Sequence, residues 1–267
     1  MPRRHYGKRR YEVSRSERLV SVDFEISSTC QARCKVCQRI DEFGKLNDFV
    51  QTTKTLAEVI YILGDLVKQL KEVKLCGNYG DPMACEEVAD ICEWLVDQNP
   101  DIRIDIATNG AIGKPKTYAR LGKLGVNITF GLDGSTQESN ELYRVNVKWA
   151  DAMKNLKAYS ETSTAKDSGW QFLLFDQNKE HLEPAIKLAI EYGLCQMYIN
   201  AMPNPFSSGI IPLKNSNAII ANDSPIQKLD MYDISGTEIL YQLTPAFGMA
   251  EQVKQLKDKY ATDMLFV

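Results

Sequence analysis

Residues 22–37 read VDFEISSTCQARCKVC, a β-rich run followed at once by three cysteines. The run Val22–Ser27 predicts a short strand, and Cys30, Cys34 and Cys37 form a C-x3-C-x2-C pattern in the loop that leaves it. Three thiolates in one loop suit a soft metal, and no CxxC or CxH pair elsewhere supplies the fourth ligand of a structural zinc site. A [4Fe–4S] cluster normally takes four cysteines, so three would leave one iron open to a further ligand.

The rest of the chain alternates between short β-rich runs and longer stretches with apolar residues at three-four spacing. Strands are predicted at 72–76, 103–107, 127–132, 170–175 and 196–200, and helices at 56–70, 85–98, 114–124, 147–160 and 179–192. Six strands joined by helices predict an α/β fold with a parallel sheet, a partial (β/α)6 barrel over residues 20–202. Active sites on such sheets lie at the carboxyl ends of the strands, where the three cysteines fall.

Two regions flank this predicted core. Residues 203–267 form a C-terminal extension that is broken by prolines and looks helical only over Pro245–Tyr260. Residues 1–19 form a basic N-terminal arm: the first twenty positions hold seven Lys or Arg against two Glu, whereas the whole chain has a net charge of −3. Such an arm is either a solvated tail, which we favour, or a contact for nucleic acid or an acidic partner.

The composition is that of a globular protein. The chain has 267 residues, of which 44% are hydrophobic and 25% charged, and this excludes a mainly disordered or fibrous protein. No apolar run approaches the roughly 18 residues of a membrane span, and the N-terminus lacks an apolar signal core. We therefore expect a cytoplasmic protein without membrane contact, in a reducing compartment where its seven cysteines stay thiols or bind metal.

Three further strands end in short motifs rich in glycine and polar residues. They are GNYGDP at 77–82, TNG at 108–110 and LDG at 132–134, the last followed by LYR at 142–144. Together with CQARCKVC, these ordered motifs resemble the signature of the radical S-adenosylmethionine (radical SAM) enzymes, in particular their peptide-maturing and molybdopterin-related branches. The resemblance covers about residues 20–200.

The resemblance implies which residues hold two cofactors, a [4Fe–4S] cluster and S-adenosylmethionine (SAM). The expected cluster ligands are Cys30, Cys34 and Cys37. The expected SAM contacts are Val36 at the adenine, Gly77, Asn78, Tyr79, Gly80 and Asp81 around the methionine amino group, Thr108 and Asn109 at the methionine or ribose, Asp133 at the ribose, and Arg144 at the methionine carboxylate. No catalytic residue toward the substrate is assigned.

Residue types alone leave plainer interpretations open for these SAM contacts: a glycine-rich βα turn, an Asp N-cap, polar turn formers and a surface arginine. Three positions also depart from the family pattern. Asp81 stands where the family has glutamate, Gly131 where serine is common, and Val36 where an aromatic residue is common.

The implied function is that of a radical SAM enzyme, which cleaves SAM reductively to a 5′-deoxyadenosyl radical that abstracts hydrogen from a substrate. The resemblance favours a peptide or protein side chain as substrate and an external electron donor of the flavodoxin or ferredoxin kind. No cysteine follows Cys195, so we expect no auxiliary clusters in the extension. The alternatives are a radical SAM enzyme acting on RNA or a nucleotide, a non-catalytic iron–sulfur protein that transfers electrons or senses redox state, and a zinc-stabilised binding module.

Overall fold

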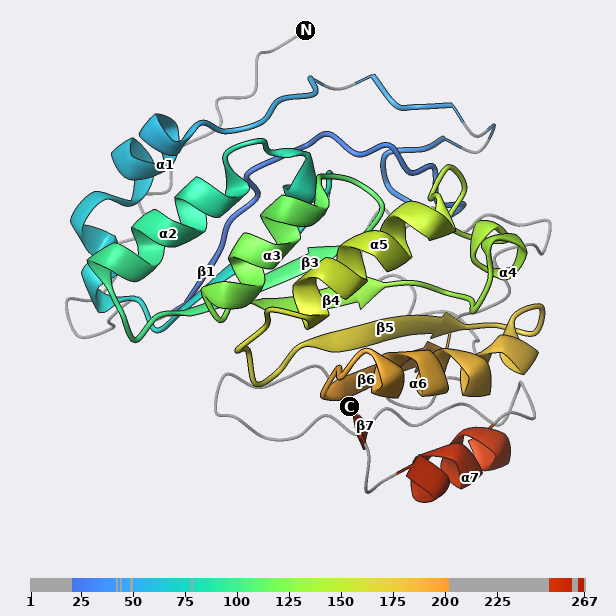
Figure 1. Ribbon diagram of the computed structural model, residues 1–267. Helices are drawn as coiled ribbons and strands as arrows, with labels where there is room; N and C mark the ends of the chain where they lie inside the picture. The colour runs from blue at the N-terminus through green and yellow to red at the C-terminus, as the bar shows by residue number, and fades with distance from the viewer. Residues whose placement is uncertain are drawn as a thin grey trace, which may run out of the picture.

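The sheet of this protein has seven strands that follow one another in chain order, and every neighbouring pair is parallel (Figure 1). The structure is a computed structural model that describes residues 21–201, apart from 42, 44, 49 and 78, together with 250–260 and 264–266. The strands are β1 Ser21–Asp23, β2 Glu72–Leu75, β3 Arg103–Thr108, β4 Asn127–Gly131, β5 Gly169–Leu174, β6 Gln196–Ala201 and β7 Leu265–Phe266.

The edge strands β1 and β7 have no hydrogen-bonded partner on their outer sides within the described sheet, so the barrel is open. This confirms the predicted partial barrel and its six strands. The seventh strand comes from the C-terminal extension and was not predicted, because two residues are too short to show a period. The basic arm at 1–19 and residues 203–249 of the extension lie outside the described residues.

The helices connect consecutive strands. They are α1 Leu56–Leu63, α2 Val88–Gln98, α3 Pro115–Lys123, α4 Gln137–Glu141, α5 Trp149–Ser160, α6 Leu182–Glu191 and α7 Ala250–Tyr260, with 3-10 turns η1 Gly64–Gln69, η2 Pro82–Ala84 and η3 Lys179–His181. Helices α2, α3, α5 and α6 cover one face of the sheet (Figure 1). None of the described helices has both the length and the apolar composition needed to cross a bilayer.

The first helix corrects one sequence prediction. A single helix was expected over 56–70, but α1 ends at Leu63 and a 3-10 turn continues to Gln69. Thr55 and Glu58 form a capping box that starts α1, and Gly64 ends it with φ +45°, a backbone conformation that other residues rarely adopt. The apolar spacing continues through the break, which is why periodicity alone did not reveal it.

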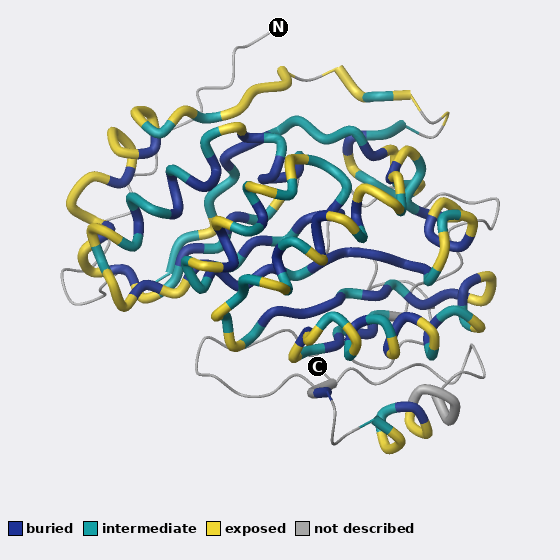
Figure 2. Tube along the Cα trace, in the orientation of Figure 1, coloured by how far each residue is buried: buried dark blue, intermediate teal, exposed yellow. Residues whose placement is uncertain are grey.

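The two faces of the sheet differ in polarity. Buried strand residues such as Ile106 and Phe172 belong to the same apolar core as the helices, and Figure 2 shows the middle strands as mostly buried. The alternate positions, among them Ala107, Thr129 and Gln171, are only partly buried and line a cavity on the other face. Side chains along a strand alternate between the two faces of the sheet, so these alternate positions give the open barrel a polar concave side.

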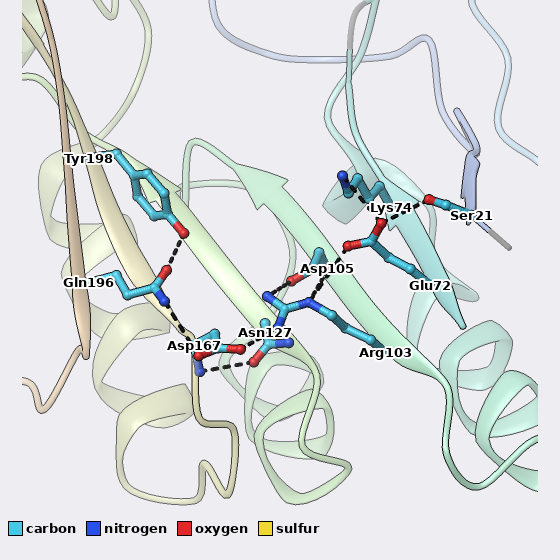
Figure 3. Close-up of polar contacts among 9 residues, drawn as sticks. All are labelled: Ser21, Glu72, Lys74, Arg103, Asp105, Asn127, Asp167, Gln196 and Tyr198. Carbon is cyan, nitrogen blue, oxygen red and sulfur yellow. Dashed lines mark hydrogen bonds and ion pairs between the residues drawn. The ribbon is translucent and has the colours of Figure 1, made fainter. Parts of the chain in front are cut away.

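A chain of polar contacts crosses the sheet near the beginnings of its strands (Figure 3), whereas the cysteines follow the end of β1. We call it the polar belt, and its members are Ser21, Glu72, Lys74, Arg103, Asp105, Asn127, Asp167, Gln196 and Tyr198. Arg103 is central: its guanidinium binds Asp105 at 2.7 and 2.8 Å, pairs with Asp167, and lies 3.7 Å from Glu72. The belt therefore links side chains from β1 to β6.

Candidate active site

The loop after β1 carries the three cysteines and is fixed by contacts to distant parts of the chain. The Arg33 amide donates to the Val145 carbonyl at 2.8 Å. The guanidinium of Arg39, which is only 3% exposed, donates to the carbonyls of Cys30 at 3.1 Å and Ala32 at 3.3 Å. The buried Arg39 guanidinium thus joins two carbonyls of the cysteine loop to its own position seven to nine residues further along the chain.

The three cysteines open onto one cavity of about 180 Å³ together with the carboxyl ends of β2 to β5. The residues that line it are Cys30, Ala32, Cys34, Cys37, Arg39, Gly77, Gly80, Asp81, Ala107, Thr108, Asn109, Thr129, Gly131, Arg144 and Gln171. The motifs that the sequence placed after separate strands therefore meet at one site, as the topology of a parallel sheet requires.

The turn after β2 needs its two glycines for close backbone packing. A Cβ atom on Gly77 would lie 1.8 Å from the carbonyl oxygen of Gly80, and one on Gly80 would lie 2.1 Å from the carbonyl oxygen of Ser27. Both clashes are with backbone, which cannot move aside as a side chain can. The glycines therefore let this turn sit against the segment that leads into the cysteine loop.

Asp81 joins the ends of β2 and β3. Its carboxylate accepts hydrogen bonds from the Met83 amide at 3.0 Å, the Thr108 hydroxyl at 2.8 Å, and the Asn109 amide and side-chain Nδ2 at 2.9 and 2.6 Å. The contact with Met83 is the N-cap that the sequence left open as an alternative. Burial raises the pKa of the Asp81 carboxyl above its usual value.

Asn109 extends this network to the cysteine loop. Its Oδ1 accepts from Gln31 Nε2 at 2.8 Å, and its Nδ2 lies 3.5 Å from the Cys30 sulfur. Asp81, Asn109 and Gln31 thus connect two strand ends to the loop through direct hydrogen bonds.

Arg144 enters the cavity from the turn between α4 and α5. Its Nε donates to Asp133 Oδ2 at 2.6 Å, and its guanidinium lies against Gly131, the last residue of β4. The Asp133 side chain is 0% exposed, and that of Arg144 is 16% exposed. Burial raises the pKa of Asp133, and the guanidinium of Arg144 acts against that rise.

The model of the radical SAM superfamily matches residues 24–189 of this chain. The chain belongs to the radical SAM superfamily. This confirms the resemblance stated from the motifs, and with it the assignment to an enzyme family that uses SAM and an iron–sulfur cluster.

Individual known proteins are also similar to this chain, at low sequence identity. The GTP 3′,8-cyclase of Paenarthrobacter nicotinovorans is 27% identical over 125 residues, which make up 46% of this chain and 34% of the cyclase. SuiB of Streptococcus suis bound to S-adenosylmethionine superposes with a TM-score of 0.63 at 15% identity, over 93% of this chain and 50% of SuiB. The AdoMet-bound enzyme anSMEcpe gives a TM-score of 0.53 at 15% identity, over 68% of this chain and 52% of that one. This chain thus spans about half or less of each relative's length.

Three cysteines that line one cavity are a donor set that fits an iron–sulfur cluster. No group of three or more His, Cys, Asp or Glu side chains in the described part of the chain is arranged to hold one ion. The cysteines of a cluster bind different irons, so they do not have to converge on one point. Burial raises the pKa of Cys30 to about 12 and also raises that of Cys34, so thiolates here need an adjacent positive centre, which coordinated iron provides.

The structure does not bring every predicted site residue to the cavity. Val36 is partly buried outside its lining, and Asn78 lies outside the described residues. Tyr79 is 46% exposed, and its amide donates to Glu25 Oε1 at 2.5 Å. Asp133 lies behind Arg144, not on the cavity surface.

Six lining residues were not predicted as cofactor contacts: Ala32, Arg39, Gly131, Ala107, Thr129 and Gln171. The last three could have been predicted from the strand pattern, because they alternate with buried apolar positions on the same strands. Nothing in the sequence distinguishes Arg39 from the other arginines, because its burial depends on how the loop folds back.

Proposed function

We propose that this chain is a radical SAM enzyme whose Cys30, Cys34 and Cys37 hold a [4Fe–4S] cluster and leave one iron for SAM. The observation that carries the proposal is the single cavity shared by the three cysteines and the ends of β2 to β5. When bound and reduced by one electron, the cluster and SAM supply a 5′-deoxyadenosyl radical that abstracts hydrogen from the substrate.

The chain's own residues bind and orient. Arg39 fixes the cysteine loop through two carbonyls, and the network of Asp81 and Asn109 fixes the loop against the strand ends. Arg144 presents a cation to the cavity, which suits the methionine carboxylate. The polar face beyond, with Thr129 and Gln171, is open to the remainder of SAM and to a substrate.

The substrate class that we favour is a peptide or protein side chain. SuiB is also known bound to the precursor peptide SuiA, and anSMEcpe with bound AdoMet and Kp18Cys peptide. An external flavodoxin-like or ferredoxin-like donor in the cytoplasm would supply the electron.

The test is anaerobic reconstitution with iron and sulfide, followed by dithionite, SAM and chromatography for 5′-deoxyadenosine. We expect wild type to form 5′-deoxyadenosine and the single Cys30→Ala, Cys34→Ala and Cys37→Ala variants to form none. Cys195→Ala is the matched control, since Cys195 is exposed and far along the chain from the loop. An active Cys30→Ala variant, or zinc bound in place of iron, would contradict the proposal. A cluster whose EPR spectrum ignores SAM would indicate an electron-transfer protein instead.

A further inference from the structure

Arg39 places a buried positive charge against the cysteine loop. Its side chain lines the same cavity as the three cysteines, and the residue is only 3% exposed. Nη2 donates to the carbonyl of Cys30 at 3.1 Å, and Nη1 donates to that of Ala32 at 3.3 Å. Because Cys30 itself carries one of the proposed cluster ligands, these contacts hold the guanidinium close to the place of the cluster.

The backbone on both sides of Arg39 is also held. The Ile40 amide donates to the Cys37 carbonyl at 2.9 Å, and the Asn47 amide donates to the Arg39 carbonyl at 2.7 Å. Ile40 and Leu46 form an antiparallel bridge, so the chain turns back directly after Arg39. The side chain therefore starts from a fixed point and its charge has a fixed position relative to the cysteines.

The other charged groups of the cavity do not take over this role. Arg144 is paired with Asp133 at 2.6 Å, so these two charges largely cancel. The Asp81 carboxylate opposes Arg39, but it is turned toward the end of β3, where it accepts from the amide and the Nδ2 of Asn109 at 2.9 and 2.6 Å. Arg39, in contrast, is hydrogen-bonded to the cysteine loop itself.

The Cys30 sulfur lies beside further positive dipoles. It accepts from the Ala32 amide at 3.4 Å, and Asn109 Nδ2 lies 3.5 Å away. Hydrogen bonds to the cysteine sulfurs and the net charge around a cluster both affect its reduction potential. The guanidinium and these N–H groups therefore act in the same direction at the same cysteine.

The direction of this effect follows from the charges. Reduction adds one electron to a cluster that three thiolates already surround, so the reduced form is the more negative one. A nearby cation stabilises that form more than the oxidised form, and it does so more strongly where burial limits screening by water. Removal of the cation should therefore lower the reduction potential.

We propose that Arg39 sets the reduction potential of the cluster held by Cys30, Cys34 and Cys37, making it easier for the external donor to reduce. The electron passes from the donor to the cluster, and no bond to Arg39 forms or breaks. Arg39 is thus a positioning residue whose charge acts on the cluster. This inference rests on the proposed function.

The test is an EPR-monitored redox titration of the reconstituted enzyme without SAM, so that the result does not depend on turnover. Arg39→Gln removes the charge, and Arg39→Lys keeps it. Arg33→Gln is the control, because Arg33 stands between Cys30 and Cys34 but is exposed to solvent.

We expect Arg39→Gln to lower the equilibrium constant for reduction roughly tenfold or more, a shift of about 59 mV for a one-electron couple. Arg39→Lys and Arg33→Gln should stay within about twofold of wild type, since the first keeps the buried charge and the second changes a charge that water screens. A merely structural role of Arg39 would lower the amount of bound cluster without moving the potential of the fraction that remains.

A wild-type potential in cluster-containing Arg39→Gln would overturn the inference and leave the proposed function standing. If Arg39→Gln binds no cluster, Arg39→Lys decides: a wild-type potential supports the inference, and a potential lowered tenfold or more despite the retained charge overturns it. Failure of the wild-type protein to assemble a [4Fe–4S] cluster would overturn the proposed function as well.

Discussion

At the scale of single residues, the site depends on buried polar side chains that bind one another before any ligand arrives. Asp81 is the clearest case, since it is 3% exposed and accepts hydrogen bonds from Thr108 and Asn109 at the end of β3. If such an acceptor is removed, its buried donors lose their hydrogen-bond partner. The free-energy cost of leaving them unpaired exceeds the stabilisation that the hydrogen bond itself contributed.

We expect Asp81→Asn to lower the free energy of unfolding by about 2 kcal/mol, because an amide nitrogen would then face the donors of Thr108 and Asn109. Urea denaturation monitored by circular dichroism measures this change. Asp65→Asn is the control: Asp65 is exposed, and its ion pair among the described residues is with Lys68, so the variant's denaturation midpoint should stay at the wild-type value. Equal midpoints for wild type and Asp81→Asn would show that the network does not support the fold.

Only part of this site could be predicted from the sequence, for a physical reason. The cysteines, the glycines after β2 and Arg144 carry motif spacing, and the structure brings them together. What spacing does not show is which polar groups already satisfy one another. The resemblance implies a ribose contact for Asp133, and the structure adds that its carboxylate accepts hydrogen bonds from Arg144 and from the Leu173 amide, which no motif indicates.

At the scale of elements, the C-terminal helix α7 is attached to α6 by charged groups. Glu183 of α6 accepts from Lys259 Nζ at 2.7 Å and from the Tyr260 hydroxyl at 2.9 Å, and it lies 3.3 Å from Lys187. Hydrogen bonds from Lys259, Tyr260 and Lys187 hold the pKa of Glu183 at about 2. Ionised Glu183 therefore favours the docked helix.

This contact predicts an acid-sensitive α7. The folded pKa of about 2 lies below the ordinary glutamate value of about 4.3, so the stabilisation is complete above that ordinary value and declines as pH falls toward 2. An NMR titration of the Glu183 carboxyl carbon should give a midpoint near the lower value. Amide exchange in α7 should be faster in Glu183→Gln than in wild type at pH 6, with the difference shrinking in acid. A midpoint at the ordinary value would mean that the contact is absent in solution.

The elements themselves were predicted well where periodicity runs long and poorly where it is short. The predicted strands and the longer helices are present, although several ends differ by a few residues. Helix α4 was missed because it has five residues, and its Thr136 capping box was not recognised. The pairing of β7 with β6 brings together segments separated by more than sixty residues, which no local pattern can indicate.

At the scale of the whole molecule, the open barrel is polar at both ends and apolar between sheet and helices. The side chains of the polar belt join the beginnings of neighbouring strands (Figure 3). The edge strands β1 and β7 of the described sheet do not pair with each other. Arg103 connects three carboxylates, those of Glu72, Asp105 and Asp167, although its side chain is 40% exposed.

We expect Arg103→Gln to destabilise the protein by about 1 kcal/mol, since partial exposure screens the three carboxylates that it leaves without a cation. Denaturation at low and high salt should show a smaller loss at high salt. SAM affinity should not change, because the belt residues lie at or near the strand beginnings, whereas the cavity is lined by the cysteine loop and residues toward the strand ends. Arg120→Gln, which breaks a pair of exposed contacts on the helix layer, is the matched control. A stability loss that does not respond to salt would contradict the electrostatic account.

The anchoring of the cysteine loop has a consequence for biosynthesis. The loop leaves the ribosome early, just after β1, but the Val145 carbonyl that binds Arg33 and the Asn109 side chain beside Cys30 are translated much later. A nascent chain therefore exposes three thiols before their supporting groups exist. If these cysteines hold the proposed cluster, the contacts that support the loop are complete only after the turn that bears Arg144 and Val145 has emerged.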